Sequence, residues 1–174
     1  MPCLTICARD GNRNVKHGCA FIRSRGAPNS SANIMNGSQA QSNVGSTRAY
    51  GSCVLRRQDC ARIVGEALCH FDGERLALIS SVVMPNHVHA LFVQSADWLL
   101  ETLLRSWKSF TSRKINSLLG RSGRLWQQDY FDRLVRDQKH FANCVRYIRR
   151  NPAKARLHNG EFILYESELA RSIE

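Results

Sequence analysis

Two apolar runs separated by a short turn constrain the fold of this chain more than any other feature. The runs cover residues 75–83 and 87–94, and each has the length and apolar content of a buried strand. Between them lies Met84-Pro85-Asn86, whose proline and asparagine favour a turn. The sequence therefore predicts a β-hairpin.

Helices are expected on both sides of this hairpin in the sequence, because apolar residues recur there at helical spacing. Each expected helix begins at an aspartate that can cap it: Asp59, Asp97 and Asp137. Gly73 and Gly120 end the first two helices, and Pro152 ends the third because the residue before a proline disfavours helical conformation. These elements predict an α+β domain, an antiparallel sheet with its helices packed on one side.

The first part of the chain lacks the composition of a packed domain. Residues 26–47 contain no charged residue and consist mainly of Ser, Asn, Gly, Ala and Gln. Such a segment buries too little apolar surface to offset its loss of conformational entropy. We therefore expect residues 1–47 to be disordered or poorly packed and residues 48–174 to form the domain. Two short apolar runs, residues 4–7 and 19–22, are candidates for strands there.

Positive charge is concentrated in one part of the chain. The 174 residues have a net charge of +11, and residues 97–157 hold fourteen basic and five acidic residues. This charge suits a phosphate backbone, which releases counterions on neutralisation, but a solvated helical face would have the same composition.

Other features exclude several classes of protein. The seven cysteines form no CxxC pair, which argues against a disulfide framework and a four-ligand zinc site. The longest apolar run is far shorter than the ~20 residues of a membrane span. The first thirty residues lack a signal-peptide pattern. We expect a cytoplasmic protein of one domain that has no membrane partner.

Two histidines stand in the second strand of the predicted hairpin. Successive side chains of a strand alternate between faces, so His87 and His89 share one face. Two neutral imidazoles side by side provide half of a divalent-metal site. Taken alone, the triplet His87-Val88-His89 also fits an alternative, a pair of surface histidines beside a turn.

A tyrosine in the last expected helix is the candidate nucleophile. Tyr147 lies at the border of the buried stripe, and Asn151 follows at i+4 on the same face. A tyrosine hydroxyl attacks when it loses its proton or faces a polarised electrophile. The alternative is a half-buried tyrosine that anchors the helix to the sheet. Tyr130 is the reserve nucleophile, in a loop-like stretch where a structural anchor is favoured.

Four motifs occur in an order and at a spacing typical of one family. They are residues 82–89 (VVMPNHVH), 106–111 (SWKSFT), 125–133 (LWQQDYFDR) and 147–155 (YIRRNPAKA). On these motifs the chain resembles the REP-associated tyrosine transposases, relatives of the single-tyrosine HUH transposases. The resemblance covers about residues 50–168.

The resemblance implies a fold, an activity and roles for four residues. The fold would be that of an HUH endonuclease, with ferredoxin-like topology. His87 and His89 would bind a divalent cation, Mg²⁺ or Mn²⁺, and Asn151 would complete its coordination. Tyr147 would cleave single-stranded DNA at palindromic repeats that form hairpins, leaving a 5′-phosphotyrosine and a free 3′-hydroxyl for strand transfer. The partner would be single-stranded or hairpin DNA, and the protein would act as a monomer or a homodimer.

Basic residues and one tryptophan are the candidates for DNA binding. We expect phosphate contacts from Arg105, Lys108, Lys114, Arg121, Arg124, Arg133, Arg146, Arg149, Arg150 and Lys154. Trp126 is expected to stack on an unpaired base, with burial under the basic loop of residues 121–124 as the alternative.

The chain departs from the family pattern at two places. Family members begin with a strand of the type Tyr-hydrophobic-Val-Thr beside the histidine strand, and residues 1–49 contain no clear copy. Either residues 4–8 or residues 19–23 substitute for it, or unrelated sequence has replaced it. Arg156 stands where the family has glycine, which predicts strain in the turn after the last helix.

Two other functions remain open at this stage. A chain without the first strand would bind palindromic repeats as a catalytically impaired protein. A chain in which Tyr147 only packs would be a metal-dependent hydrolase.

Overall fold

The computed structural model describes residues 6–7, 19–24 and 53–174. The expectation of disorder or poor packing over residues 1–47 falls mostly outside these ranges. Among the described helices, none is long and apolar enough to cross a membrane.

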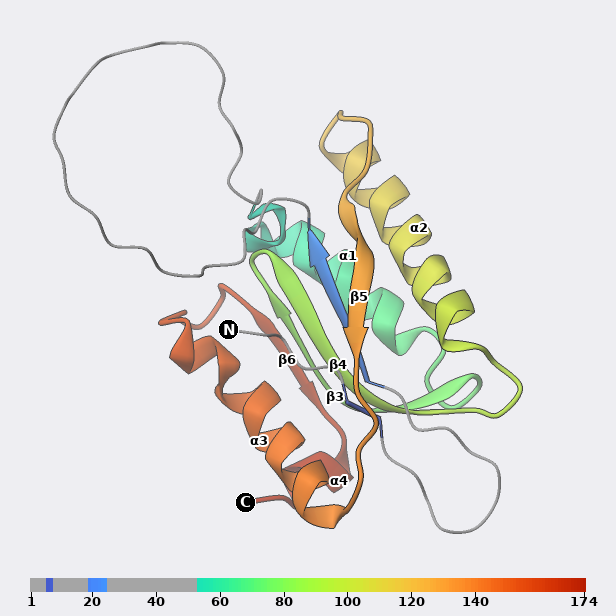
Figure 1. Cartoon of the computed structure of the whole chain (residues 1–174). Helices are drawn as coiled ribbons and strands as arrows, with labels where there is room; N and C mark the ends of the chain where they lie inside the picture. Colours follow the sequence, from blue (N-terminus) through green and yellow to red (C-terminus); the bar gives the residue numbers. More distant parts are fainter. Residues whose placement is uncertain (1–5, 8–18, 25–52) are drawn as a thin grey trace, which may run out of the picture.

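Six strands of the described chain form one sheet (Figure 1). They are β1 (Ile6–Cys7), β2 (Cys19–Ser24), β3 (Leu76–Met84), β4 (His87–Gln94), β5 (Trp126–Asp132) and β6 (Ile163–Glu166). The order is β5-β2-β4-β3-β6, and every pair on this path is antiparallel, whereas β1 pairs with β4 in parallel. The predicted hairpin is confirmed as β3 and β4, which pair from Met84 and His87 outward.

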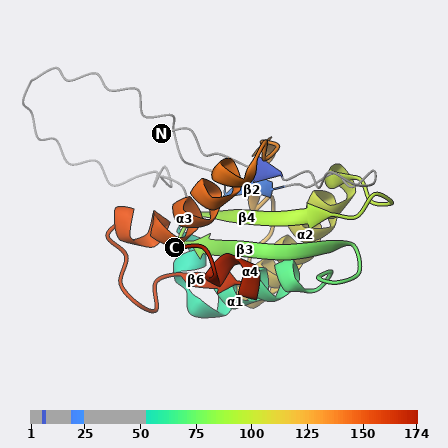
Figure 2. The ribbon, with the colours of Figure 1, turned by 90° about the horizontal axis from the view of Figure 1, so that it is seen from below.

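Helices cover both faces of the sheet, so the expectation of helices on one side is wrong. Helices α1 (Gln58–Cys69) and α2 (Leu100–Leu118) lie on one face, and α3 (Gln138–Lys154) and α4 (Glu168–Arg171) lie on the other. A short 3₁₀ helix, η1 (Val54–Arg56), precedes α1. Figure 2 shows α3 and α1 on opposite sides of β3 and β4. Nearly every residue of β3 is buried, and a strand that is apolar on both faces needs cover on both.

Two apolar clusters lie on opposite sides of β4. Val88, Ala90 and Phe92 pack with α1 and α2, whereas Leu91 packs with Val145 of α3. Because side chains alternate along a strand, His87 and His89 point to the same face as Leu91. The histidines therefore lie on the face that α3 covers.

The predicted first strand has two substitutes in the structure. Strand β2 pairs with β4 along five residues, with Phe21 opposite His89, and β1 pairs with β4 at Leu91 and Phe92. Both candidate runs therefore form strands beside the histidine strand. The segment around Tyr130, expected to be loop-like, is strand β5, since it pairs with β2.

Two of the predicted helix starts are displaced. Helix α1 begins one residue before Asp59, and α2 begins three residues after Asp97, where residues 96–97 form a turn. The third start is confirmed, because the Asp137 side chain accepts a hydrogen bond from the backbone N–H of His140 at 2.7 Å.

Helix α3 continues to Lys154, two residues past the predicted end at Pro152. Proline in the last turn removes only one backbone hydrogen bond, and burial of its ring helps to offset this cost. The helix then closes with hydrogen bonds from Leu157 N to the Pro152 carbonyl (2.9 Å) and from Arg156 N to the Ala153 carbonyl (3.0 Å). This pattern is a Schellman motif.

Arg156 has a φ of 55° in this motif, the left-handed conformation that glycine adopts at low cost. It is the one non-glycine residue with positive φ in the described part of the chain. The strain predicted from the sequence at this position is present in the backbone.

Candidate active site

The two histidines of β4 lie side by side in the sheet. Their ring centroids are 4.9 Å apart and their planes meet at 87°. His89 is 1% exposed and His87 is half-buried. Because β4 lies between β2 and β3, its backbone is hydrogen-bonded on both sides, which fixes the position of the pair.

Asn86 orients the first of these histidines. Its Oδ1 lies 2.6 Å from Nδ1 of His87 and accepts a hydrogen bond from that nitrogen. In a neutral imidazole with a protonated Nδ1, the lone pair lies on Nε2. Sequence reasoning missed this role, although Asn86 directly precedes His87 in the turn.

Helix α3 brings Tyr147 to the histidine pair. Cys144, Val145 and Ile148 pack into the cluster beneath α3, and Tyr147 lies at the border of this buried stripe. The Tyr147 ring meets the His89 ring edge to face, with centroids 5.4 Å apart at 82°. The structure thus brings together two residues that the sequence separates by 58 positions.

Two residues on the same side of α3 surround the tyrosine. Asn151 donates a hydrogen bond from Nδ2 to the backbone carbonyl of Tyr147 at 3.2 Å, which restrains the amide. Lys154 places its Nζ 5.0 Å from the centroid of the Tyr147 ring. Asn151 is half-buried and Lys154 is exposed, so a neutral amide oxygen and a cation accompany the phenol.

The side chains at the histidine pair determine which metal ion could bind there. In the described ranges, no group of three or more His, Cys, Asp and Glu side chains is arranged to hold a metal ion. A cation at this place would be held by the imidazoles of His87 and His89 together with the amide oxygen of Asn151. Nitrogen and oxygen ligands of this kind fit a divalent ion such as Mn²⁺, with positions left for phosphate oxygens.

Tyr130 lies on the opposite face of the sheet. The register runs from Tyr130 through Ile22 to Val88, and Tyr130 packs with the cluster of α1 and α2. Burial raises the pKa of Tyr130, and the charges of Asp132 and Glu101 raise it further. This side chain therefore does not face the histidines, which favours its interpretation as an anchor.

Trp126 is buried, so the predicted stacking on a base is wrong. It is 3% exposed, and its Nε1 donates a hydrogen bond to Oγ1 of Thr111 at 2.7 Å. The structure supports the burial that the alternative predicted, but the partner of this β5 residue is α2, where Thr111 lies.

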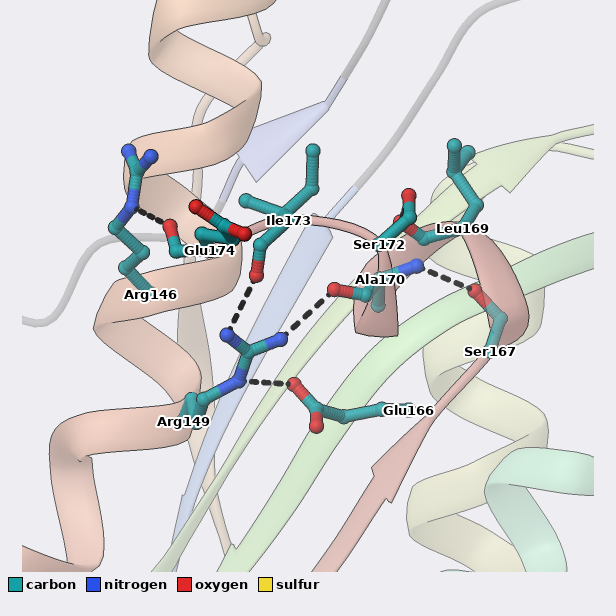
Figure 3. A network of polar contacts seen from close by, with 9 residues as sticks. All are labelled: Arg146, Arg149, Glu166, Ser167, Leu169, Ala170, Ser172, Ile173 and Glu174. Atoms are coloured by element: carbon teal, nitrogen blue, oxygen red, sulfur yellow. Dashed lines mark hydrogen bonds and ion pairs between the residues drawn. The ribbon is translucent and has the colours of Figure 1, made fainter.

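Arg149 is engaged within the fold (Figure 3). Its guanidinium donates hydrogen bonds to Glu166 Oε1 (2.8 Å) and to the backbone carbonyls of Ala170 (2.8 Å) and Ile173 (2.6 Å). These bonds tie α3 to β6 and to the last residues of the chain. Because its nitrogens serve this network, the structure argues against the predicted phosphate contact of Arg149.

The other predicted basic residues fall into two main groups. Arg105, Lys108 and Arg124 line a groove of about 730 Å³ between α2 and β5, on the face opposite the histidines. Arg146, Arg150 and Lys154 lie on α3. Arg146 donates a hydrogen bond to the backbone carbonyl of Glu174 (Figure 3) and another to Oδ1 of Asn143. Arg150 is exposed.

Three more of the basic residues predicted to contact phosphate are exposed, and they lie outside these two groups. Lys114 stands over the Phe110 ring of α2, Arg121 donates to Oδ1 of Asn116 at 3.0 Å, and Arg133 follows the end of β5. All three positions are open to a phosphate backbone.

One family model and two solved structures are similar to this chain. The model of the family described as "Transposase IS200 like" matches residues 55–151, a range that includes His87, His89, Tyr147 and Asn151. No curated protein matches the chain. A solved structure of a REP-associated tyrosine transposase bound to a REP hairpin is similar, with 20% identity and a TM-score of 0.53 over 84% of this chain and 74% of that one.

A second solved structure, a putative transposase from Deinococcus radiodurans R1, has 17% identity and a TM-score of 0.45, covering 81% of this chain and 94% of that one. The family match spans more than half of the chain and contains both the histidine pair and the tyrosine. This chain therefore belongs to the IS200-like transposases, a family of DNA transposition.

Proposed function

We propose that this chain cuts and rejoins single-stranded DNA at palindromic repeats that form hairpins, through a 5′-phosphotyrosine at Tyr147. A divalent cation, Mg²⁺ or Mn²⁺, would be held by His87, His89 and Asn151. The observation that supports this proposal most is the contact of the Tyr147 and His89 rings, 5.4 Å between centroids. It puts a candidate nucleophile beside the candidate metal ligands.

The chemistry needs one bond to form and one to break at each step. The Tyr147 oxygen attacks phosphorus, its O–H proton is lost, and the P–O3′ bond breaks to give a protonated 3′-hydroxyl. In rejoining, another 3′-hydroxyl attacks the same phosphorus, the bond between phosphorus and the Tyr147 oxygen breaks, and Tyr147 regains a proton. The bound cation would withdraw charge from the phosphate and orient the scissile bond.

The protein's own part is to position the attacking group. Tyr147 stands on a helix whose buried stripe packs against β3 and β4, so the distance from the phenol to the histidines is set by the core. Holding two reacting groups in a fixed geometry removes much of the entropic cost of their encounter. The exposed Arg150 and Lys154 on the same helix supply positive charge for the DNA backbone.

The presence of β1 and β2 bears on the first alternative function. A protein that only binds repeats was inferred from the loss of the first strand. Both segments pair with β4, so the histidine strand is bordered on that side. This pairing supports cleavage over binding alone.

The test is a cleavage assay with a labelled hairpin that has a single-stranded flank, in the presence of Mn²⁺. We expect a denaturant-resistant protein–DNA adduct that disappears in Tyr147→Phe and persists in the control Tyr130→Phe. Tyr147→Phe that still nicks DNA, with loss of nicking only in His87→Ala, would favour the hydrolase. Binding without cleavage in the unmodified protein would favour the binding protein.

A further inference from the structure

We propose that Phe131 is the stacking surface for an unpaired base of single-stranded DNA on the face of the sheet that holds His89. The inference rests on the proposed function and adds the residue that binds the strand beside the site. It replaces Trp126, whose ring is buried.

Phe131 is exposed although it belongs to a strand of the sheet. Its side chain is 42% exposed although it lies within strand β5. Its neighbour Tyr130 packs against the cluster of α1 and α2, so Phe131 points to the other face of the sheet. That face is the one on which His89 and Tyr147 meet.

The strand register places Phe131 in line with the histidine. Phe131 pairs with Phe21 of β2, and Phe21 pairs with His89 of β4. Neighbouring strands are about 4.8 Å apart, which puts the Cα atoms of Phe131 and His89 roughly 10 Å apart. A DNA strand whose phosphate lies at the histidines therefore has a nearby base within reach of the ring.

The surroundings of Phe131 fit a nucleic acid better than a second copy of the chain. The exposed Leu134 follows three residues later, and the exposed Arg133 and Arg136 interleave with these apolar side chains. An aromatic ring with adjacent cations provides both base stacking and phosphate contacts. A symmetric contact between two copies would instead bring these arginines together, which is unfavourable.

The experiment measures binding without requiring cleavage. The 174-residue chain is titrated, in the absence of divalent metal, into a series of hairpins. Each hairpin has one abasic site at a different position of its single-stranded flank. For the unmodified protein we expect an abasic site at one position, near the scissile phosphate, to weaken binding roughly five- to hundredfold. This is the range for the loss of a single stacked base. Phe131→Leu should weaken binding to the hairpin without an abasic site by the same factor.

The decisive measurement combines the Phe131→Leu substitution with the abasic site. Phe131→Leu with the critical abasic site should bind no more weakly than either change alone, because both remove the same contact. Phe131→Tyr should bind as the unmodified protein does, and Leu134→Ala, the matched control, should show no such coupling. Full affinity of Phe131→Leu, or losses that add at every position, would overturn the proposal.

Two further results separate this proposal from its rivals. If Phe131→Leu converts a DNA-free dimer into a monomer in sedimentation, the ring belongs to an interface between copies and the proposal fails. Coupling without any adduct in Mn²⁺ would support Phe131 and contradict the phosphotyrosine chemistry. An adduct without coupling would support the chemistry and overturn the role of Phe131.

Discussion

The rings of His89 and Tyr147 meet edge to face, 5.4 Å between centroids, at the contact of the central strand β4 and helix α3. His89 is buried in the sheet, and Tyr147 borders the apolar stripe that fixes α3 to it. The relationship therefore depends on the packing of the core beneath α3. A change in that packing moves the phenol relative to the imidazoles.

Metal binding should stabilise the protein through the histidine pair. A ligand that binds only the folded state adds roughly 2.7 kcal/mol at a hundredfold excess over its Kd. We expect Mn²⁺ to raise the melting temperature of the unmodified protein and to have little effect on His87→Gln. His70→Gln changes an exposed histidine at the end of α1, on the opposite face of the sheet, and is the control. An equal rise in all three proteins would place the metal elsewhere.

DNA affinity should fall steeply with salt. On single strands the logarithm of the binding constant falls with the logarithm of salt concentration with a slope of about −0.7 per neutralised phosphate. Arg150→Gln, at an exposed position on α3, should reduce this slope by about one phosphate. Fluorescence anisotropy at several salt concentrations measures both slopes. A flat titration of the unmodified protein contradicts the assignment of the basic residues.

Loss of the Arg149 network should cost stability. Arg149→Gln removes the ion pair with Glu166 and the hydrogen bonds to two backbone carbonyls of the C-terminal residues. Because the arginine is partly exposed, we expect the free energy of unfolding to fall by about 2 kcal/mol. Urea denaturation measures it, and Arg150→Gln, at the exposed neighbour, should stay within about 0.5 kcal/mol. Equal effects of the two substitutions would show that the network contributes nothing.

Arg156→Gly should stabilise the protein. Arg156 pays the cost of a left-handed conformation, and glycine adopts it without strain. The free energy of unfolding should rise by about 1 kcal/mol, as measured by urea denaturation. Ala155→Gly is the matched control, because Ala155 has a φ of −84° and gains nothing from glycine. A loss of stability in Arg156→Gly would show that the arginine side chain makes a contact that outweighs the strain.

Local patterns in the sequence predicted the hairpin and the cap of the last helix. The turn at Pro85-Asn86 and the apolar runs beside it are sufficient to define β3 and β4. Alternation along β4 then places both histidines on one face without further information. Asp137 was found because an N-cap acts on residues within the next turn.

Features that depend on distant residues were not predictable in the same way. Trp126 is buried in the cluster of α1 and α2, where Thr111, fifteen positions earlier, accepts its N–H. Nothing near Trp126 in the sequence indicates this bond. The face to which Tyr130 points depends on the pairing of β5 with β2. Arg149 differs from Arg150 only in its contact with a tail more than fifteen residues away. In all three cases a contact between residues distant in the sequence determines where the side chain lies, and the local sequence does not indicate it.

The most direct test of the account is the mass of the covalently modified peptide. The protein is incubated with a hairpin substrate and Mn²⁺, digested with nuclease and protease, and analysed by mass spectrometry. We predict that a 5′-linked nucleotide phosphate is attached to the peptide that contains Tyr147, and that His87→Ala gives no modified peptide. A nucleotide on Tyr130 or on another residue, with Tyr147 unmodified, would contradict the central claim.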